Sequence, residues 1–142
     1  MLKPATAILF VGVLFAALYS LLIVVSPQTV ANSTLQARAD TSLENIQDQG
    51  AVEAILVYAR HMGVFGFCIS ISMFFVLFAG FKKGQKWAWW AFLFVAGIAW
   101  LYGLLTQIGE GDKMNLIGHV IGTGLWIIGI LLPIKVFFAK KA

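Results

Sequence analysis

The sequence predicts an all-α polytopic membrane protein: an antiparallel bundle of four transmembrane helices, with a short extracytoplasmic amphipathic helix between the first two. Four apolar stretches support this, because each is long enough to cross a hydrocarbon core of about 30 Å as a helix. They cover residues 5–25, 54–81, 87–108 and 115–138. Acidic and basic residues also fall mostly in different connections between these stretches. All six carboxylates fall in the first and third connections, whereas seven of the ten Lys and Arg fall in the second connection or near the termini.

The composition excludes an ordinary soluble domain. The chain of 142 residues is 61% hydrophobic and 11% charged, which leaves too few charges to cover a soluble globule. Four helices and their connections use nearly every residue, so the sequence predicts a single membrane domain. The net charge of +4 does not indicate nucleic-acid binding, because the basic residues cluster at helix ends, where they act as topology signals and lipid-headgroup anchors.

The charge separation also predicts an orientation. Cytoplasmic loops of membrane proteins carry an excess of Lys and Arg. Both termini are therefore expected in the cytoplasm, and the acidic segment from Gln28 to Glu53 outside. The expected location is the cytoplasmic (inner) membrane of a bacterium.

The first apolar stretch predicts a retained helix that ends at Pro27. Its uncharged run is longer than the apolar core of a signal peptide. A proline cannot supply the N–H that a continuing helix needs. Gly12, Ala16 and Ala17 are small enough to allow close helix contact. After it, Thr41-Ser42-Leu43-Glu44 is typical of a capping box and predicts the amphipathic helix, which we expect Gly50 to end.

The later connections are short, at residues 82–86 and 109–113, so consecutive helices are expected to be neighbours. Trp87, Trp89 and Trp90 follow the first of these connections. Indole rings favour the headgroup boundary, which predicts three interface anchors. Trp100 and Trp126 lie deeper by residue count, where an indole N–H needs a partner within the protein.

Gly118 and Gly122 form a G-x-x-x-G pattern that allows another helix to pack closely, within the bundle or in a partner.

The candidate ligand or partner-binding residues are Arg60, His61, His119 and Glu110. Both histidines fall near the outer ends of their helices, and they would converge if the second and fourth helices faced each other. Two histidines and a carboxylate suit zinc, copper or iron, and two facing histidines suit haem. The spacing matches no ligand motif, which favours interfacial histidines bonded to backbone, headgroups or a partner.

The layout resembles that of the small four-helix DoxX-like bacterial membrane proteins. The resemblance rests on the extracytoplasmic segment after the first helix, on Arg60-His61-Met62-Gly63, and on the stretch from Lys83 to Trp90. It implies the four-helix fold and assigns no functional residue.

The sequence thus predicts a non-catalytic accessory subunit of a larger integral-membrane complex, such as a respiratory, photosynthetic or oxygenase assembly. The alternative is a small membrane redox, metal-binding or haem-binding protein that uses His61 and His119. No catalytic constellation, metal site or bound cofactor is expected, although contact with haem, metal, pigment or quinone stays open. The expected partners are membrane lipids and other integral-membrane subunits, not nucleic acid.

Overall fold

The computed structural model describes residues 1–110 and 113–139, and no strand occurs among them. The elements are α1 (Leu2–Val25), α2 (Pro27–Ala39), η1 (Leu43–Asn45), α3 (Gln49–Ala79), η2 (Phe81–Lys83), α4 (Lys86–Ala91), η3 (Phe92–Ala96), α5 (Gly97–Glu110), α6 (Lys113–Leu131) and α7 (Ile134–Phe138). Because η3 is a π-helical turn, α4, η3 and α5 form one continuous rod. Three helical segments are long and apolar enough to cross a membrane, residues 2–25, 49–83 and 86–109, whereas the apolar part of α6 is shorter, Leu116–Leu131.

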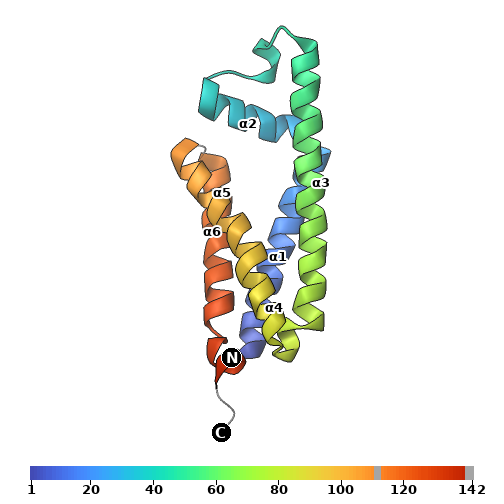
Figure 1. Ribbon diagram of the computed structural model, residues 1–142. Coiled ribbons are helices and arrows are strands. Elements are labelled where there is room, and N and C mark those ends of the chain that lie inside the picture. Colours follow the sequence, from blue (N-terminus) through green and yellow to red (C-terminus); the bar gives the residue numbers. More distant parts are fainter. Residues whose placement is uncertain (111–112, 140–142) are drawn as a thin grey trace.

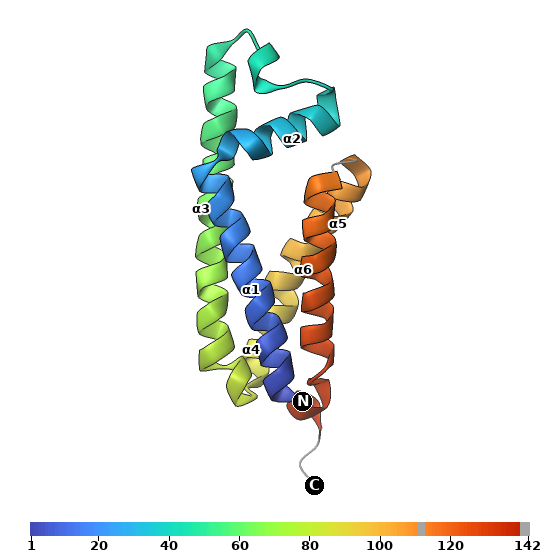
Figure 2. The ribbon, with the colours of Figure 1, turned by 180° about the vertical axis from the view of Figure 1, so that it is seen from behind.

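The rods lie side by side, and α1 is the central one. It packs along both α3 and α6, and α5 packs on α6 (Figures 1 and 2). The N-terminus and α7 lie at one end, which we call the proximal end. At the other, distal end, α2 lies across the direction of the rods. The chain therefore places α3 and α6 on different sides of α1.

The first helix ends as predicted, at Val25. Pro27 then opens α2, where its missing N–H is not needed. The helix expected from Thr41 is wrong, however. The helix in this connection is α2, and the segment after it forms only the single turn η1. Asp40 ends α2 in a left-handed conformation with φ 46°, and the N–H of Leu43 then bonds to Asn32 Oδ1 at 2.8 Å.

The second long helix begins earlier than the apolar pattern predicts, at Gln49 rather than residue 54. The Asp48 carboxylate accepts hydrogen bonds from the N–H groups of Gly50 (2.9 Å) and Ala51 (3.2 Å). Those first-turn N–H groups have no partner within the helix, so this cap stabilises the start. Gly50 therefore lies inside the first turn and does not break the helix.

The distal part of α3 extends beyond α1. Gly63 packs against Ser20 and Val24, which are close to the end of α1. The part of α3 that precedes Gly63 therefore extends beyond the end of α1, and α2 packs against α3. We call residues 27–61 the distal arm (Figure 1).

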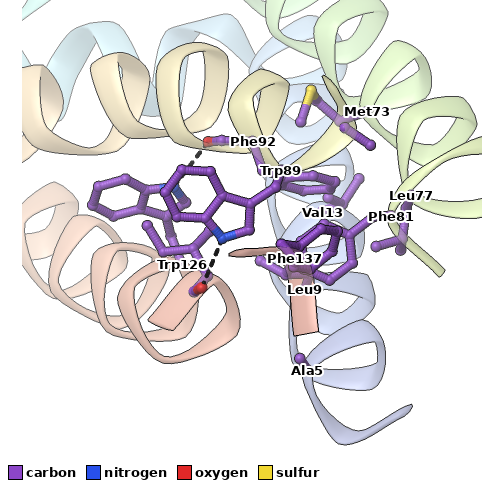
Figure 3. Close-up of a cluster of buried hydrophobic side chains, with 12 residues drawn as sticks. Ala5, Leu9, Val13, Met73, Leu77, Phe81, Trp89, Phe92, Trp126 and Phe137 are labelled. Carbon is purple, nitrogen blue, oxygen red and sulfur yellow. Dashed lines mark hydrogen bonds between the residues drawn. The ribbon is translucent and has the colours of Figure 1, made fainter. Parts of the chain in front are cut away.

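The proximal half holds the hydrophobic core (Figure 3). We call this cluster the proximal core; its buried members are Ala5, Leu9, Val13, Met73, Leu77, Phe81, Ala88, Trp89, Phe92, Trp126, Ile130 and Phe137. Phe81 is fully buried at its centre, with ring centroids 5.3 Å from Phe92 and 5.0 Å from Phe137. Aromatic rings from α4, η3, α6 and α7 thereby seal this end.

Two indoles tie the proximal core to the backbone of neighbouring rods. The N–H of Trp126 donates to the Phe92 carbonyl, and that of Trp89 to the Ile130 carbonyl, each at 2.9 Å (Figure 3). The partner expected for the deep indole of Trp126 is thus confirmed.

The fourth apolar stretch is not one helix, as residues 115–138 had suggested. It breaks after Leu131, because Pro133 cannot continue α6, and α7 follows. The break brings Phe137 into the proximal core.

Candidate functional site

A cavity of about 180 Å³ lies among the four rods and is partly open to the surroundings. Along α1 it reaches from Leu9 to Ser20, roughly 16 Å at 1.5 Å per residue. α3 and the α5 rod both line it, but they do not pack extensively on each other. The cavity shares part of its lining with the proximal core, at Leu9, Val13, Met73, Phe92 and Trp126, and it continues from there toward the distal arm.

Small side chains create the empty space. Several small residues line the cavity. They include Gly12 and Ala16 of α1, Gly66 of α3, and Ala96 and Ala99 of the rod formed by α4, η3 and α5. Glycine and alanine usually let helices approach closely. Here α1 and α3 do approach closely, because a Cβ on Gly66 would overlap Ser20, and the void lies where α3 and α5 do not pack extensively on each other.

Large rings pack against two further glycines. Trp126 lies where a Cβ on Gly97 would stand, and Trp100 occupies the same place at Gly122. Because each ring fills the space of a missing side chain, the separation of α5 and α6 is set by the indoles.

The polar groups gather toward the distal end of the cavity. They are Tyr19 and Ser20 of α1, Ser70 of α3 and His119 of α6. The Ser70 hydroxyl donates to the Gly66 carbonyl at 2.9 Å. Ser20 is 8% exposed, and its Oγ makes no hydrogen bond with any described residue. The proximal end is instead lined by hydrocarbon and indole.

His119 is held in place by packing. Its ring lies against buried Gly103, where any Cβ would overlap it. It also meets Trp100 edge to face at 5.9 Å, and Trp100 stacks on Phe15 at 6.3 Å. The imidazole is therefore a half-buried member of an aromatic cluster on the cavity wall.

The structure does not bring His61 and His119 together. His61 is exposed on the distal arm, two residues before Gly63, which packs on Ser20 and Val24. His119 follows Gly118, and Gly118 faces Phe15 of α1. Phe15 lies at least five residues nearer the proximal end of α1 than Ser20 and Val24 do. Since α1 lies between α3 and α6, the convergence that a shared metal or haem requires is absent.

The remaining candidates do not join either histidine in a described cluster. Arg60 is exposed beside His61. Cys68, which is not one of these candidates, is exposed on α3. The side chain of Glu110 lies outside the described residues. Within the described ranges, no three His, Cys, Asp or Glu side chains are placed to hold a metal ion.

The tryptophan anchors divide into two kinds. Trp87 is 50% and Trp90 44% exposed, as expected of interface anchors. Trp89 is buried and hydrogen-bonded to α6, so its assignment as an anchor is wrong. Its neighbours point outward because residues one apart on a helix do not share a face.

The G-x-x-x-G pattern packs inside the molecule. Gly122 is buried against Trp100, and Gly118 approaches Phe15 at 3.8 Å, measured from the position of a Cβ. The sequence left open whether this pattern packs within the bundle or against a partner, and the structure shows packing within the bundle.

Sequence reasoning missed the polar end of the cavity. Ser20 continues the stripe of Gly12 and Ala16 at intervals of four residues, and Ser70 lies four residues after Gly66. That spacing places each set on one helix face. Nothing in it reveals that a void separates the two faces.

Comparison with protein-family models, with known proteins and with solved structures found no match to this chain. The resemblance in layout to DoxX-like proteins therefore stays a prediction.

Proposed function

We propose that the protein is a non-catalytic accessory subunit of a larger integral-membrane complex. In this proposal its four rods cross a bacterial cytoplasmic membrane as an antiparallel bundle, with both termini in the cytoplasm. The lysines support that orientation, because Lys3, Lys82, Lys83, Lys86 and Lys135 belong to segments at the proximal end. The distal arm then stands on the outer face.

The observation that carries the subunit role is the construction of the distal arm. Its shape is fixed by specific contacts, including the bond from Leu43 to Asn32 and the Asp48 cap. Leu43 and Ala31 are buried within it. A connection that only joined two spans would not need this much defined structure, whereas a recognition surface does.

The surface of the arm suits a protein partner. Tyr58 is 69% exposed and lies beyond the end of α1. Tyrosine is enriched in protein–protein interfaces. Glu44 and Glu53 are exposed on the same arm.

Charge indicates what kind of partner. From Gln28 to Glu53 the chain carries one arginine against four carboxylates, a net charge of −3. Complementary charge steers association and fixes register. The proposed partner is therefore a membrane subunit with a basic extramembrane surface.

Orientation is tested by single cysteines in a Cys68→Ala background. A membrane-impermeant maleimide applied to intact cells should label Gln36→Cys on the distal arm and leave Gln85→Cys at the proximal end unlabelled. The reverse pattern would overturn the orientation.

Assembly is tested by native gels after gentle detergent extraction. The wild type should migrate in a complex of defined stoichiometry and larger mass. Glu44→Gln/Glu53→Gln should lower the fraction in that complex several-fold, because two charges facing the partner are lost. Lys82→Gln/Lys83→Gln removes the same number of charges from the proximal end and should leave the complex intact.

The wild type migrating only as a monomer or small homo-oligomer would defeat the subunit proposal. Equal loss in both double variants would defeat the assignment to the distal arm. A ligand-binding role, which the cavity favours, would then be the better proposal.

A further inference from the structure

We propose that the central cavity is a binding site for an uncharged, lipid-soluble molecule that presents one ring and one hydrogen-bond acceptor. The site is independent of the proposed subunit role, since it lies among the rods and not on the distal arm. Three features of the cavity carry the inference: its size, its lining and the hydroxyl at its distal end.

The size selects a single ring. An apolar cavity of about 150 Å³ is known to stay dry and to bind benzene. The volume here is about 180 Å³, slightly larger. The space among the rods therefore accepts one six-membered ring with a small substituent.

The lining selects an uncharged ligand. Ile69, Met73, Val13 and the two indoles present hydrocarbon and aromatic surface, and no Lys, Arg, Asp or Glu lines the cavity among the described residues. A charge moved into such a site has no counter-charge and loses its hydration. Ring faces and edges of Trp100 and Trp126 instead favour an aromatic guest.

The distal end supplies the hydrogen bond. As a whole residue Ser20 is 8% exposed, its Oγ lies against Gly66, and that hydroxyl makes no hydrogen bond with any described residue. A hydroxyl in apolar surroundings gains from any acceptor that reaches it. A ring bearing a carbonyl or ether oxygen satisfies this group, while the ring itself fills the space between Ala16 and Ala96.

Access comes from the side. α3 and α5 line the cavity without extensive mutual contact, and the cavity is partly open. A molecule dissolved in lipid can therefore enter between these helices without crossing the proximal core.

The test uses matched fluorinated probes and fluorine NMR on the purified full chain in lipid nanodiscs. 4-Fluoroacetophenone carries the carbonyl, and 4-fluoro-α-methylstyrene is its isostere with a methylene in place of oxygen. We expect saturable binding of one equivalent, with the ketone bound about five- to tenfold more tightly, as one hydrogen bond provides. Ketone and hydrocarbon binding equally, or neither exceeding its partition into empty nanodiscs, overturns the proposal.

Variants localise the site. Ser20→Ala should lower ketone affinity about five- to tenfold and leave the hydrocarbon unchanged, whereas Ser72→Ala, whose exposed hydroxyl bonds to the Cys68 carbonyl, should change neither. Ala16→Phe fills the cavity and should lower binding of both probes at least tenfold; Ala7→Phe, outside it on the same helix, should not. Full binding by Ala16→Phe would show that the probes bind elsewhere.

Discussion

The proximal and distal halves of the molecule are packed by opposite means. In the proximal half, the rings of Phe92 and Phe137 pack on Phe81, and indole N–H groups of Trp89 and Trp126 donate to the backbone of neighbouring helices. Beyond the proximal core, glycine, alanine and serine line the distal part of a void, and polar contacts shape the arm. The difference assigns stability to one half and recognition to the other.

This division has a physical basis in the membrane setting. Lipid is as apolar as a leucine side chain, so rods gain little from hiding hydrocarbon and hold together through close packing and hydrogen bonds. Bulky rings that interlock provide many contacts at the proximal end. Small residues provide contacts only where helix backbones touch, as α1 and α3 do at Gly63, whereas α3 and α5 do not pack extensively on each other.

The largest effect is expected from truncation in the proximal core. Phe81→Ala should lower the free energy of unfolding by about 3–5 kcal/mol, because the surrounding rings cannot fully collapse into the cavity left behind. Phe75→Ala on the exposed side of α3, where the ring is 71% exposed, should cost far less. Denaturation in mixed micelles followed by circular dichroism compares the two. Equal losses would remove the distinction between sealed and open surfaces.

A smaller effect is expected at the boundary between the halves. Gly122→Leu must displace Trp100 and should cost about 2 kcal/mol, as overpacking does. Gly124→Leu, two residues along the same helix, meets nothing within 4 Å and should be nearly neutral. The same denaturation measurement applies. If Gly122→Leu were also neutral while loosening assembly with a partner, Gly122 would belong to an external interface.

The smallest effect is expected in the distal arm. Asp48→Ala removes the cap of α3 and should cost about 1 kcal/mol. The loss should stay local, appearing as faster amide hydrogen exchange at Gly50 and Ala51 with no change in the proximal core. Glu53→Ala, on an exposed position without a capping role, is the matched control. Exchange that rose throughout the molecule would show that the two halves unfold together.

The sequence predicts the helical composition well, because apolar length and the proline at position 27 depend only on local chemistry. It predicts the capped start of α3 poorly, since Asp48 lies in a polar segment outside the apolar pattern. The burial of Trp89 was also missed: three adjacent indoles look alike in sequence, and only the position of α6 decides which one is covered.

Prediction of the candidate site from sequence required even more knowledge of the tertiary arrangement than prediction of the helices did. Placing His61 opposite His119 assumed that the second and fourth apolar stretches are neighbours. Helix order along the chain does not determine which rod lies in the centre of a bundle, and here α1 takes that place. The cavity follows from the same arrangement, because residues from all four rods meet around α1.

The position of α1 between α3 and α6 is therefore the central claim, and disulfide cross-linking tests it most directly. A Cβ on Gly12 would lie 3.6 Å from the Cβ of Leu125, within the range that a disulfide spans. In a Cys68→Ala background, Gly12→Cys/Leu125→Cys should cross-link readily on mild oxidation, and His61→Cys/His119→Cys should not. Efficient cross-linking of the 61/119 pair together with failure of the 12/125 pair would contradict the arrangement.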